Sequence, residues 1–312
     1  MIAISKNKKS LTQQVYETLE SKARYGHSKH QDKADGIAQN YIYSFDTMKT
    51  YKKHCVLFAN WCRETIPRET GKTPRTLEEC RPYAERWVLE REGQGLSAYT
   101  VKMERSALSK LFGEQIDVVV KNSHRADIKR SRGVAVRDAH FSEKKNFALV
   151  TFCRCAGPRR AELEKLDASA LEIHEGKPYI RYTEGTKGGR ERLSPLIGSD
   201  EELRIALDFL KTCNGDNHVP GACDVHSYRA EYATRIYNAE KGDLQSLKGK
   251  KVNYTDLTGK RSKNGDSVQK SALYYCRGDR KGDVLDRAAM IKASQALGHN
   301  RESVVGEHYI RL

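Results

Sequence analysis

Four short segments in the second half of the chain combine arginine, lysine, histidine and tyrosine in compact patterns. They are Gly157-Pro158-Arg159-Arg160-Ala161-Glu162-Leu163, the Lys187-Gly188-Gly189 turn, His226-Ser227-Tyr228-Arg229, and Leu297-Gly298-His299 followed by Tyr309. A guanidinium is a planar, permanently charged group that holds a phosphate through two hydrogen bonds. A tyrosine hydroxyl, with an ordinary pKa of ~10, needs nearby positive charge or a base to lose its proton as it attacks. These residue types together suit the attack of a hydroxyl on a phosphodiester.

The first part of the chain reads as a bundle of helices. Apolar residues recur at three- and four-residue steps, which is the helical period. The pattern predicts helices over 9–24, 44–65, 76–92 and 97–113, with Pro67 ending the second of these. The polar stretch 26–42 is either a loop or a further short helix. Cys55 and Cys62 fall on the apolar stripe of the second helix and are expected in the core.

The second part must place the four reactive segments. Helices are expected at 142–156, 158–171, 200–212, 226–239 and 287–297, and alternation around a Gly-Gly turn predicts a β-hairpin over 179–195. Residues 274–286 suggest a second hairpin. The fold class is therefore mainly α with a small antiparallel β-sheet (α+β), in a chain of 312 residues that is long enough for two domains.

Taken in this order, the four segments resemble the tyrosine recombinase (phage integrase) family. The marks of that family are a Gly-Leu-Arg-x-x-Glu-Leu turn, a hairpin lysine, a His-x-x-Arg box, a Leu-Gly-His box and a late tyrosine. The resemblance covers roughly 140–312. It implies an N-terminal extension (1–42), a helical DNA core-binding domain (43–119), a basic linker (120–138) and a catalytic domain (139–312) with an insertion at about 240–286.

The resemblance also implies roles for individual residues. Arg159 and Arg229 would bind the phosphate oxygens, and Tyr309 would attack the phosphorus to give a 3′-phosphotyrosyl link and a free 5′-hydroxyl. Lys187 would protonate the leaving oxygen. His226 and His299 would take the tyrosine proton or bond the phosphate, and the sequence leaves open which does which. No metal and no cofactor is expected, because the arginines supply the charge that Mg²⁺ supplies in other phosphoryl-transfer sites.

Each of these residues also has a structural interpretation. Arg159 could form a surface ion pair with Glu162 or Glu164, the histidines could be core or helix-cap residues, and Lys187 could be a solvated turn lysine. Register favours Arg159 over Arg160, because Glu162 then falls where the family has its glutamate. Pro158 departs from the usual leucine, and a turn at Gly306 is expected to absorb the slightly long step from His299 to Tyr309.

The charge of the chain favours a nucleic-acid partner. Lysine and arginine number 56 against 41 aspartate and glutamate, for a net charge of +15. Two basic segments are either DNA contacts or solvated surface: the linker and the insertion. The candidate DNA-binding residues are Lys121, Arg125, Lys129, Arg130 and Arg132 in the linker, and Lys248, Lys250 and Lys251 in the insertion.

The family resemblance implies double-stranded DNA with specific target sites as the partner, a tetramer assembled on two DNA sites, and room for an accessory DNA-bending protein. A mobile element or phage is the implied setting. The sequence ends at Leu312, shortly after Tyr309, so protomer contacts are expected elsewhere than in the further C-terminal helix of many relatives. The alternatives are a type IB topoisomerase, a telomere resolvase, or a catalytically inactive DNA-binding regulator.

Other classes of protein fit the sequence less well. The first residues turn basic without an apolar segment behind them, and no apolar run is long enough to span a bilayer, so we expect a cytoplasmic protein without membrane contact. Eight cysteines in a chain of this length do not make a disulfide scaffold. Cys213, His218, Cys223 and His226 match no standard zinc spacing, so no metal site is predicted.

Overall fold

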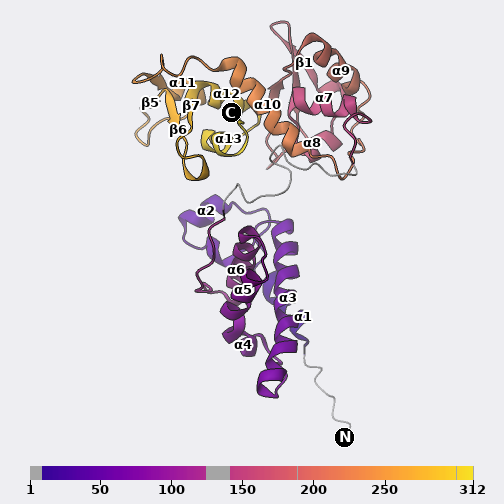
Figure 1. Ribbon diagram of the computed structural model, residues 1–312, viewed down its shortest axis with the longest axis vertical. Coiled ribbons are helices and arrows are strands. Elements are labelled where there is room, and N and C mark those ends of the chain that lie inside the picture. Colours follow the sequence, from indigo (N-terminus) through magenta and orange to yellow (C-terminus); the bar gives the residue numbers. More distant parts are fainter. Residues whose placement is uncertain (1–8, 124–140, 188, 300, 312) are drawn as a thin grey trace. The chain divides into compact units, whose positions relative to one another are not determined.

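The computed structural model describes residues 9–123, 141–187, 189–299 and 301–311. The chain divides into two compact units, Met1–Asp127 and Ile128–Leu312. Figure 1 shows the first unit in indigo and purple and the second in magenta, orange and yellow. None of the helices in the described ranges is both long enough and apolar enough to cross a membrane.

In its described residues the first unit has only helical elements, apart from an isolated β-bridge between Ala23 and Ile42. Its elements are α1 (Leu11–Glu20), α2 (Lys29–Ala34), η1 (Ala38–Asn40), α3 (Phe45–Thr70), α4 (Leu77–Cys80), η2 (Arg81–Tyr83), α5 (Ala84–Gly93) and α6 (Ala98–Phe112). Serine side chains cap α1, α3 and α6 at Ser10, Ser44 and Ser97, each accepting a backbone N–H of the first turn. One apolar core runs from Leu11 to Val118 and includes Cys55 and Cys62, as the helical stripe predicted.

The expected stop of α3 at Pro67 is wrong. The helix continues to Thr70 and ends at Gly71, which adopts a left-handed conformation with φ of 69°. Proline removes one N–H donor, but its carbonyl oxygen still accepts, here from the N–H of Gly71 at 2.9 Å. A proline in the last turn therefore removes one hydrogen bond of the helix without ending it.

The second unit contains helices and three small antiparallel sheets. Its helical elements are α7 (Phe147–Ala156), α8 (Arg160–Glu164), η4 (Ala168–Ala170), α9 (Asp200–Leu210), α10 (Val225–Glu240), α11 (Tyr254–Thr258), η5 (Gly278–Arg280), α12 (Arg287–Ala296) and α13 (Glu302–His308). Its strands are β1 (Leu171–His174), β2 (Lys177–Tyr182), β3 (Arg192–Pro195), β4 (Lys251–Asn253), β5 (Gln269–Ser271), β6 (Leu273–Tyr275) and β7 (Val284–Asp286). The sheets are β1-β2-β3, β4-β5 and β6-β7. The α+β class predicted from the sequence is confirmed.

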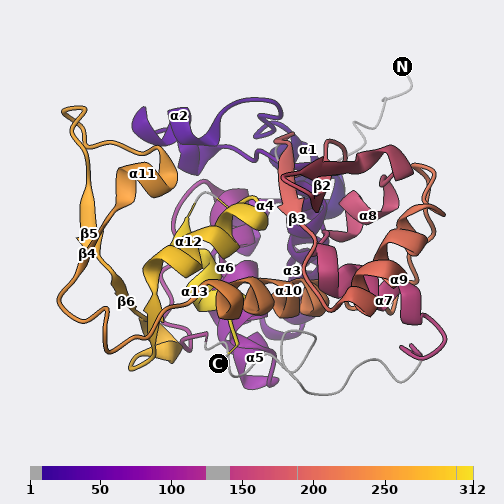
Figure 2. The ribbon, with the colours of Figure 1, turned by 90° about the horizontal axis from the view of Figure 1, so that it is seen from above.

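Helix α10 joins two halves of this unit. Figures 1 and 2 both show it between a group formed by α7, α8, α9 and β1–β3 and a group formed by α11–α13 and β4–β7. Val225 and Tyr228, near the start of α10, belong to the core of the first group. Tyr232, Ile236 and Tyr237 belong to the core of the second. One helix thus fixes the two halves against each other.

Two expectations for this unit need correction. The long helix expected over 158–171 is instead the short α8 followed by η4 and β1, because Leu163 and Leu166 are buried and the chain then turns into a strand. Gly306 makes no turn, since it lies within α13. The predicted hairpin over 274–286 is present as β6 and β7, paired from Leu273 with Asp286 to Tyr275 with Val284.

Candidate active site

A cavity of about 520 Å³ in the second unit collects the reactive residues predicted from the sequence. They come from five separate places: the turn before α8, the β2–β3 loop, the start of α10, the turn after α12, and the end of α13. The lining includes Arg159, Lys187, His226, Arg229, His299 and Tyr309. Residues that are far apart in the sequence are therefore brought to one site.

Tyr309 lies directly after α13, and its side chain is buried, with 6% of its surface exposed. The centre of its ring is 5.1 Å from the ring centre of His226 and 5.1 Å from that of His299. The guanidinium carbon of Arg229 is 5.9 Å from the same ring centre. The phenol thus has two imidazoles and a cation close by, which is the environment that activation of a tyrosine hydroxyl requires.

Arg229 is fully buried on α10. Its two terminal nitrogens donate to the carbonyl oxygens of Gly157 and Leu297. Burial, followed by the charges of Arg192 and Arg159, lowers the pKa of Arg229 to about 9, which still leaves it protonated at neutral pH. Its Nε has no hydrogen-bond partner among the described residues. A buried cation gives the site a positive potential, which favours an anionic ligand.

Arg159 and Arg160 are neighbours with different partners. Arg159 caps α8: its backbone N–H donates to Glu162 Oε2 at 2.6 Å, and its guanidinium bonds to Glu162 and to the carbonyl oxygen of Leu297 at 3.2 Å. The guanidinium of Arg160 donates instead to backbone carbonyls of the loop before α10, those of Val219, Pro220, Gly221 and Cys223 at 2.7–3.2 Å. Arg159 therefore shares its carboxylate with the rest of the site, whereas Arg160 orders a loop.

Glu162 is the only carboxylate that the described contacts give to Arg159, Arg192 and Arg229. Burial opposes its ionisation, but the hydrogen bond from Arg192 and the charges of Arg192 and Arg229 outweigh that and lower the pKa of Glu162 to about 2. Glu162 therefore stays charged. One negative charge among three guanidiniums leaves the site with net positive charge, which favours an anionic ligand.

Arg192 is a structural residue of the site that the sequence interpretation missed. It is 3% exposed on β3, and it donates to Glu162 at 2.7 Å and to the carbonyl oxygens of Gly157 at 3.1 Å and Ala296 at 2.6 Å. The sequence places it only within the predicted hairpin over 179–195. The available signal was the alternation of β3, which turns residue 192 and Ser194 to the same buried side.

The two histidines of the site come from different elements. His299 follows α12, and its backbone N–H donates to the carbonyl oxygen of Ser294 at 2.9 Å. Burial, followed by the charges of Arg229 and Arg159, lowers the pKa of His299 to about 3, so the imidazole is neutral at pH 7. His299 Nε2 has no hydrogen-bond partner among the described residues. His226 lies in the first turn of α10, which Asp224 caps.

Two glycines of the sequence motifs permit this close packing. At Gly157, with φ of 57°, a Cβ atom would lie 2.1 Å from the ring of Tyr232. At Gly298, with φ of 64°, it would lie 2.8 Å from Cδ of Arg192. A side chain at either position would collide with a neighbour and strain the backbone. Both carbonyls that bind Arg229 belong to Gly157 or to the residue before Gly298, so these turns shape the site directly.

Lys187 and those candidate DNA-binding residues that the structure describes are more exposed. Lys187 is an exposed residue of the β2–β3 loop that also lines the cavity. Lys121 is exposed, as are Lys248, Lys250 and Lys251 at and before β4. Arg125, Lys129, Arg130 and Arg132 lie outside the described residues.

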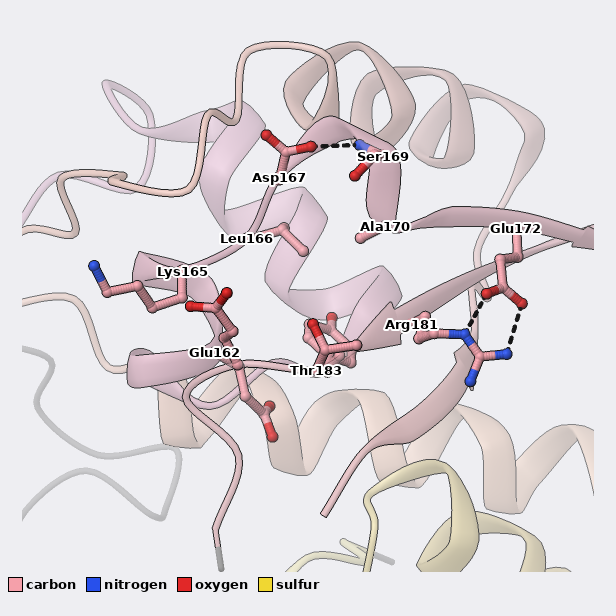
Figure 3. Close-up of a pocket in the computed structure, with 11 residues that line it drawn as sticks. Glu162, Lys165, Leu166, Asp167, Ser169, Ala170, Glu172, Arg181 and Thr183 are labelled. Carbon is pink, nitrogen blue, oxygen red and sulfur yellow. Dashed lines mark hydrogen bonds and ion pairs between the residues drawn. The ribbon is translucent and has the colours of Figure 1, made fainter. Parts of the chain in front are cut away.

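Glu162 also lines a second cavity, of about 240 Å³, together with Asp167, Glu172 and Arg181. Figure 3 shows that Arg181 pairs with Glu172 there, at 3.0 Å between Nη2 and Oε2. None of the residues that line the 520 Å³ cavity also lines this one. In the described ranges, no group of three or more His, Cys, Asp or Glu side chains is arranged to hold a metal ion, and this includes Cys213, His218, Cys223 and His226.

Comparison with known proteins identifies the fold. No protein-family model matches the chain, and no curated protein matches it. The solved structure of XerH site-specific recombinase bound to palindromic difH substrate, a post-cleavage complex, is similar with a TM-score of 0.51 and 14% identity over 97% of this chain and 91% of that one. The pre-cleavage complex of XerH with difH gives 0.50 and 14% over 96% and 91%. At this identity the likeness establishes the fold.

Proposed function

We propose that this protein is a tyrosine-type site-specific DNA recombinase that cuts and rejoins double-stranded DNA through a covalent link to Tyr309. The observation that carries the proposal is the position of the Tyr309 ring, 5.1 Å from the rings of both His226 and His299 in a cavity that Arg159 and Arg229 also line. An anion-binding site that holds a buried phenol between two imidazoles is suited to attack on a phosphodiester.

The arginines bind the phosphate in this mechanism. Attack adds negative charge to the non-bridging oxygens, and preorganised guanidiniums stabilise that charge as it develops. Arg229 offers its unused Nε, and Arg159 is the more exposed of the two, with 22% of its side chain accessible. No metal or cofactor is part of the proposal.

The proton transfers follow from the same geometry. As the Tyr309 oxygen bonds to phosphorus, its proton passes to one of the two imidazoles that flank the ring, and the P–O5′ bond breaks. Lys187, in the β2–β3 loop, gives a proton to the departing 5′ oxygen. The products are a 3′-phosphotyrosine and a 5′-hydroxyl, and rejoining reverses each step. The phosphodiester bond energy is conserved in the phosphotyrosine, so no nucleotide is consumed.

The rest of the chain serves DNA binding in this proposal. Residues 43–119 act as the core-binding domain after an extension (1–42). Residues 120–138 act as the basic linker, which contacts the phosphate backbone, and residues 139–312 act as the catalytic domain. The net charge of +15 favours a polyanion. The XerH structures hold difH substrate, which supports specific double-stranded DNA as the partner here. We further propose assembly as a tetramer on two sites, with room for a DNA-bending protein, in the cytoplasm and for a mobile element.

A nicked suicide substrate tests the proposal. A nick close to the cleaved phosphate lets the short 5′ fragment leave, so the covalent adduct accumulates. We expect wild-type protein to form the adduct in EDTA and Tyr309→Phe to form none while binding the same DNA with unchanged affinity. Absence of an adduct with wild-type protein on target DNA identifies a DNA-binding regulator instead. Relaxation of supercoiled DNA without two-site recombination identifies a topoisomerase.

A further inference from the structure

The insertion at 240–286 is a folded part of the catalytic unit. It contains β4, α11, β5, β6, η5 and β7, and Figure 2 shows these elements beside α12 and α13. Cys276 and Leu285 belong to the same apolar core as Val305, Tyr309 and Ile310. The insertion and the helix that precedes Tyr309 therefore share a core.

The C-terminal end of α13 is held by Arg280 of η5. One terminal nitrogen of its guanidinium donates to the carbonyl oxygens of Gly306 at 2.5 Å and Ile310 at 2.7 Å, on either side of Tyr309 in the sequence. Its Nε bonds to Asp283 at 2.7 Å, and 18% of its side chain is exposed. The last carbonyls of a helix lack partners within the helix, and a cation there is favourable. Arg280 satisfies both needs.

The N-terminal end of α13 is held by the other part of the insertion. Glu302, the first residue of α13, accepts hydrogen bonds from the hydroxyl of Tyr254 at 2.7 Å and from Lys270 Nζ at 3.0 Å. Burial opposes ionisation of Glu302, but these two hydrogen bonds outweigh it and lower its pKa. Tyr254 begins α11 and Lys270 lies on β5, so both α11 and the β4–β5 sheet of the insertion reach α13.

The middle of α13 rests on the insertion as well. A Cβ atom at Gly306 would lie 2.9 Å from Sδ of Met290, 3.4 Å from Leu285 and 3.5 Å from Tyr274. Leu285 is on β7 and Tyr274 on β6, so the hairpin approaches the helix backbone directly. A side chain at this position would require the side chain of Met290 to shift, so close packing accounts for Gly306 better than the turn expected from the sequence.

We propose that the insertion positions the nucleophile within its own protomer, with Arg280 and Tyr254 as positioning residues that act on Tyr309 through α13. This rests on the proposed recombinase function for its catalytic consequence. Helix α13 has 7 residues, too few to be stable alone, so tertiary contacts must hold it. The insertion supplies contacts at both ends and in the middle. Thr234 of α10 also donates to the carbonyl oxygen of Tyr309, at 3.3 Å. The contacts at both ends of α13 come from the insertion, which contributes no lining residue to the cavity.

Hydrogen exchange combined with single-turnover cleavage tests this inference. The amides of Tyr309 and Ile310 both donate to the carbonyl oxygen of Val305, at 3.0 and 3.1 Å, so their exchange reports opening at this point. In Arg280→Ala we expect ~10-fold or faster exchange at these amides, the scale for losing a hydrogen bond to a charged group. The amide of Lys211, which bonds Leu207 at the end of α9, serves as the internal reference.

We expect the same variant to form the Tyr309 adduct ~10-fold or more slowly at saturating protein, with unchanged DNA affinity. Arg280→Lys, which keeps one charged donor, should recover part of the rate, and Tyr254→Phe should show a smaller loss. Arg277→Ala is the matched control, because it removes an exposed arginine of the same hairpin and should leave both readouts unchanged. The conservative variants keep the test valid if Arg280→Ala fails to fold.

Unchanged exchange at Tyr309 and Ile310 in Arg280→Ala and Tyr254→Phe overturns the inference. So does faster exchange with an unchanged rate of adduct formation. Faster exchange in a protein whose wild type forms no adduct at all supports the positioning of Tyr309 and overturns the recombinase function instead.

Discussion

The guanidinium carbon of Arg229 lies 5.9 Å from the centre of the Tyr309 ring, and two nitrogens of the same group donate to the carbonyl oxygens of Gly157 and Leu297. Those carbonyls belong to the turns that also present Arg159 and His299. One buried cation thus connects the nucleophile to the turn of Arg159 and to the turn of the neutral His299, and its position depends on backbone atoms that substitution of a side chain leaves in place.

Arg229→Ala and Arg159→Ala should each slow adduct formation by ~10²-fold or more, the scale for losing one preorganised donor to a developing anion. Arg160→Ala should cost less than about tenfold at saturating DNA, because Arg160 donates to carbonyls of the loop before α10 and pairs with Glu164 at 3.9 Å, and does not share Glu162. Single-turnover rates on the suicide substrate measure all three. Equal losses at Arg159 and Arg160 would show that the phosphate lies against a different arginine.

Lys187→Ala should slow cleavage because the 5′ oxygen then leaves without a proton. A substrate with sulfur in place of the bridging 5′ oxygen provides the check, since a thiolate leaves without protonation. We expect the variant to regain a rate within about tenfold of wild type on the sulfur substrate, after a loss of ~10²-fold on normal DNA. A variant equally slow on both substrates would indicate that Lys187 only binds DNA.

His299 predicts a specific pH dependence of stability. Its pKa is about 3 in the folded protein and 6.5 ordinarily, so between these values the unfolded state binds the proton and the folded state does not. Stability from this residue is therefore full above pH 6.5 and falls as the pH drops toward 3, by at most ~1.4 kcal/mol per pH unit and by less here, since the residue borders an open cavity. Urea unfolding of wild type and His299→Asn from pH 7 to 4 should show a flatter profile for the variant.

The reactive residues could be predicted from the sequence because each belongs to a short local motif. Gly157 and Gly298 mark turns whose backbone has to adopt positive φ, and such requirements are visible in residue types. The parts that were missed depend on contacts between distant segments. Arg192 is buried against Glu162, and Arg280 donates to a carbonyl oxygen of α13. Both contacts join residues far apart in the chain, and no local pattern encodes them. The same holds for Pro67, whose effect was decided by Gly71 one turn later.

Because the insertion is folded, its structure separates the lysines that could contact DNA from the lysine that pairs with α13. Lys248, Lys250 and Lys251 are exposed at and before β4, whereas Lys270 on β5 pairs with Glu302 at 3.0 Å. In the β4–β5 ladder Val252 lies opposite Lys270, and Lys251 lies opposite Ser271. Because successive side chains of a strand alternate between faces, Lys251 points to the face opposite Lys270. The outer face of this ribbon is therefore free to meet DNA while the inner face holds α13.

Replacing Lys248, Lys250 and Lys251 together by alanine should weaken DNA binding and reduce its dependence on salt. Each lost phosphate contact should lower the magnitude of the slope of log affinity against log salt by about one. Adduct formation at saturating protein should keep its wild-type rate, because these residues lie outside the cavity and make none of the contacts that hold α13.

The matched control replaces Lys165, Lys177 and Lys211, which are also exposed, lie on the other half of the unit and remove the same charge. If both triple variants shift the salt slope equally, the lysines of the insertion affect DNA binding only through the net charge of the protein. If the first variant keeps wild-type affinity and slope, its lysines make no DNA contact, and the outer face of the ribbon is then better explained as a protein–protein surface.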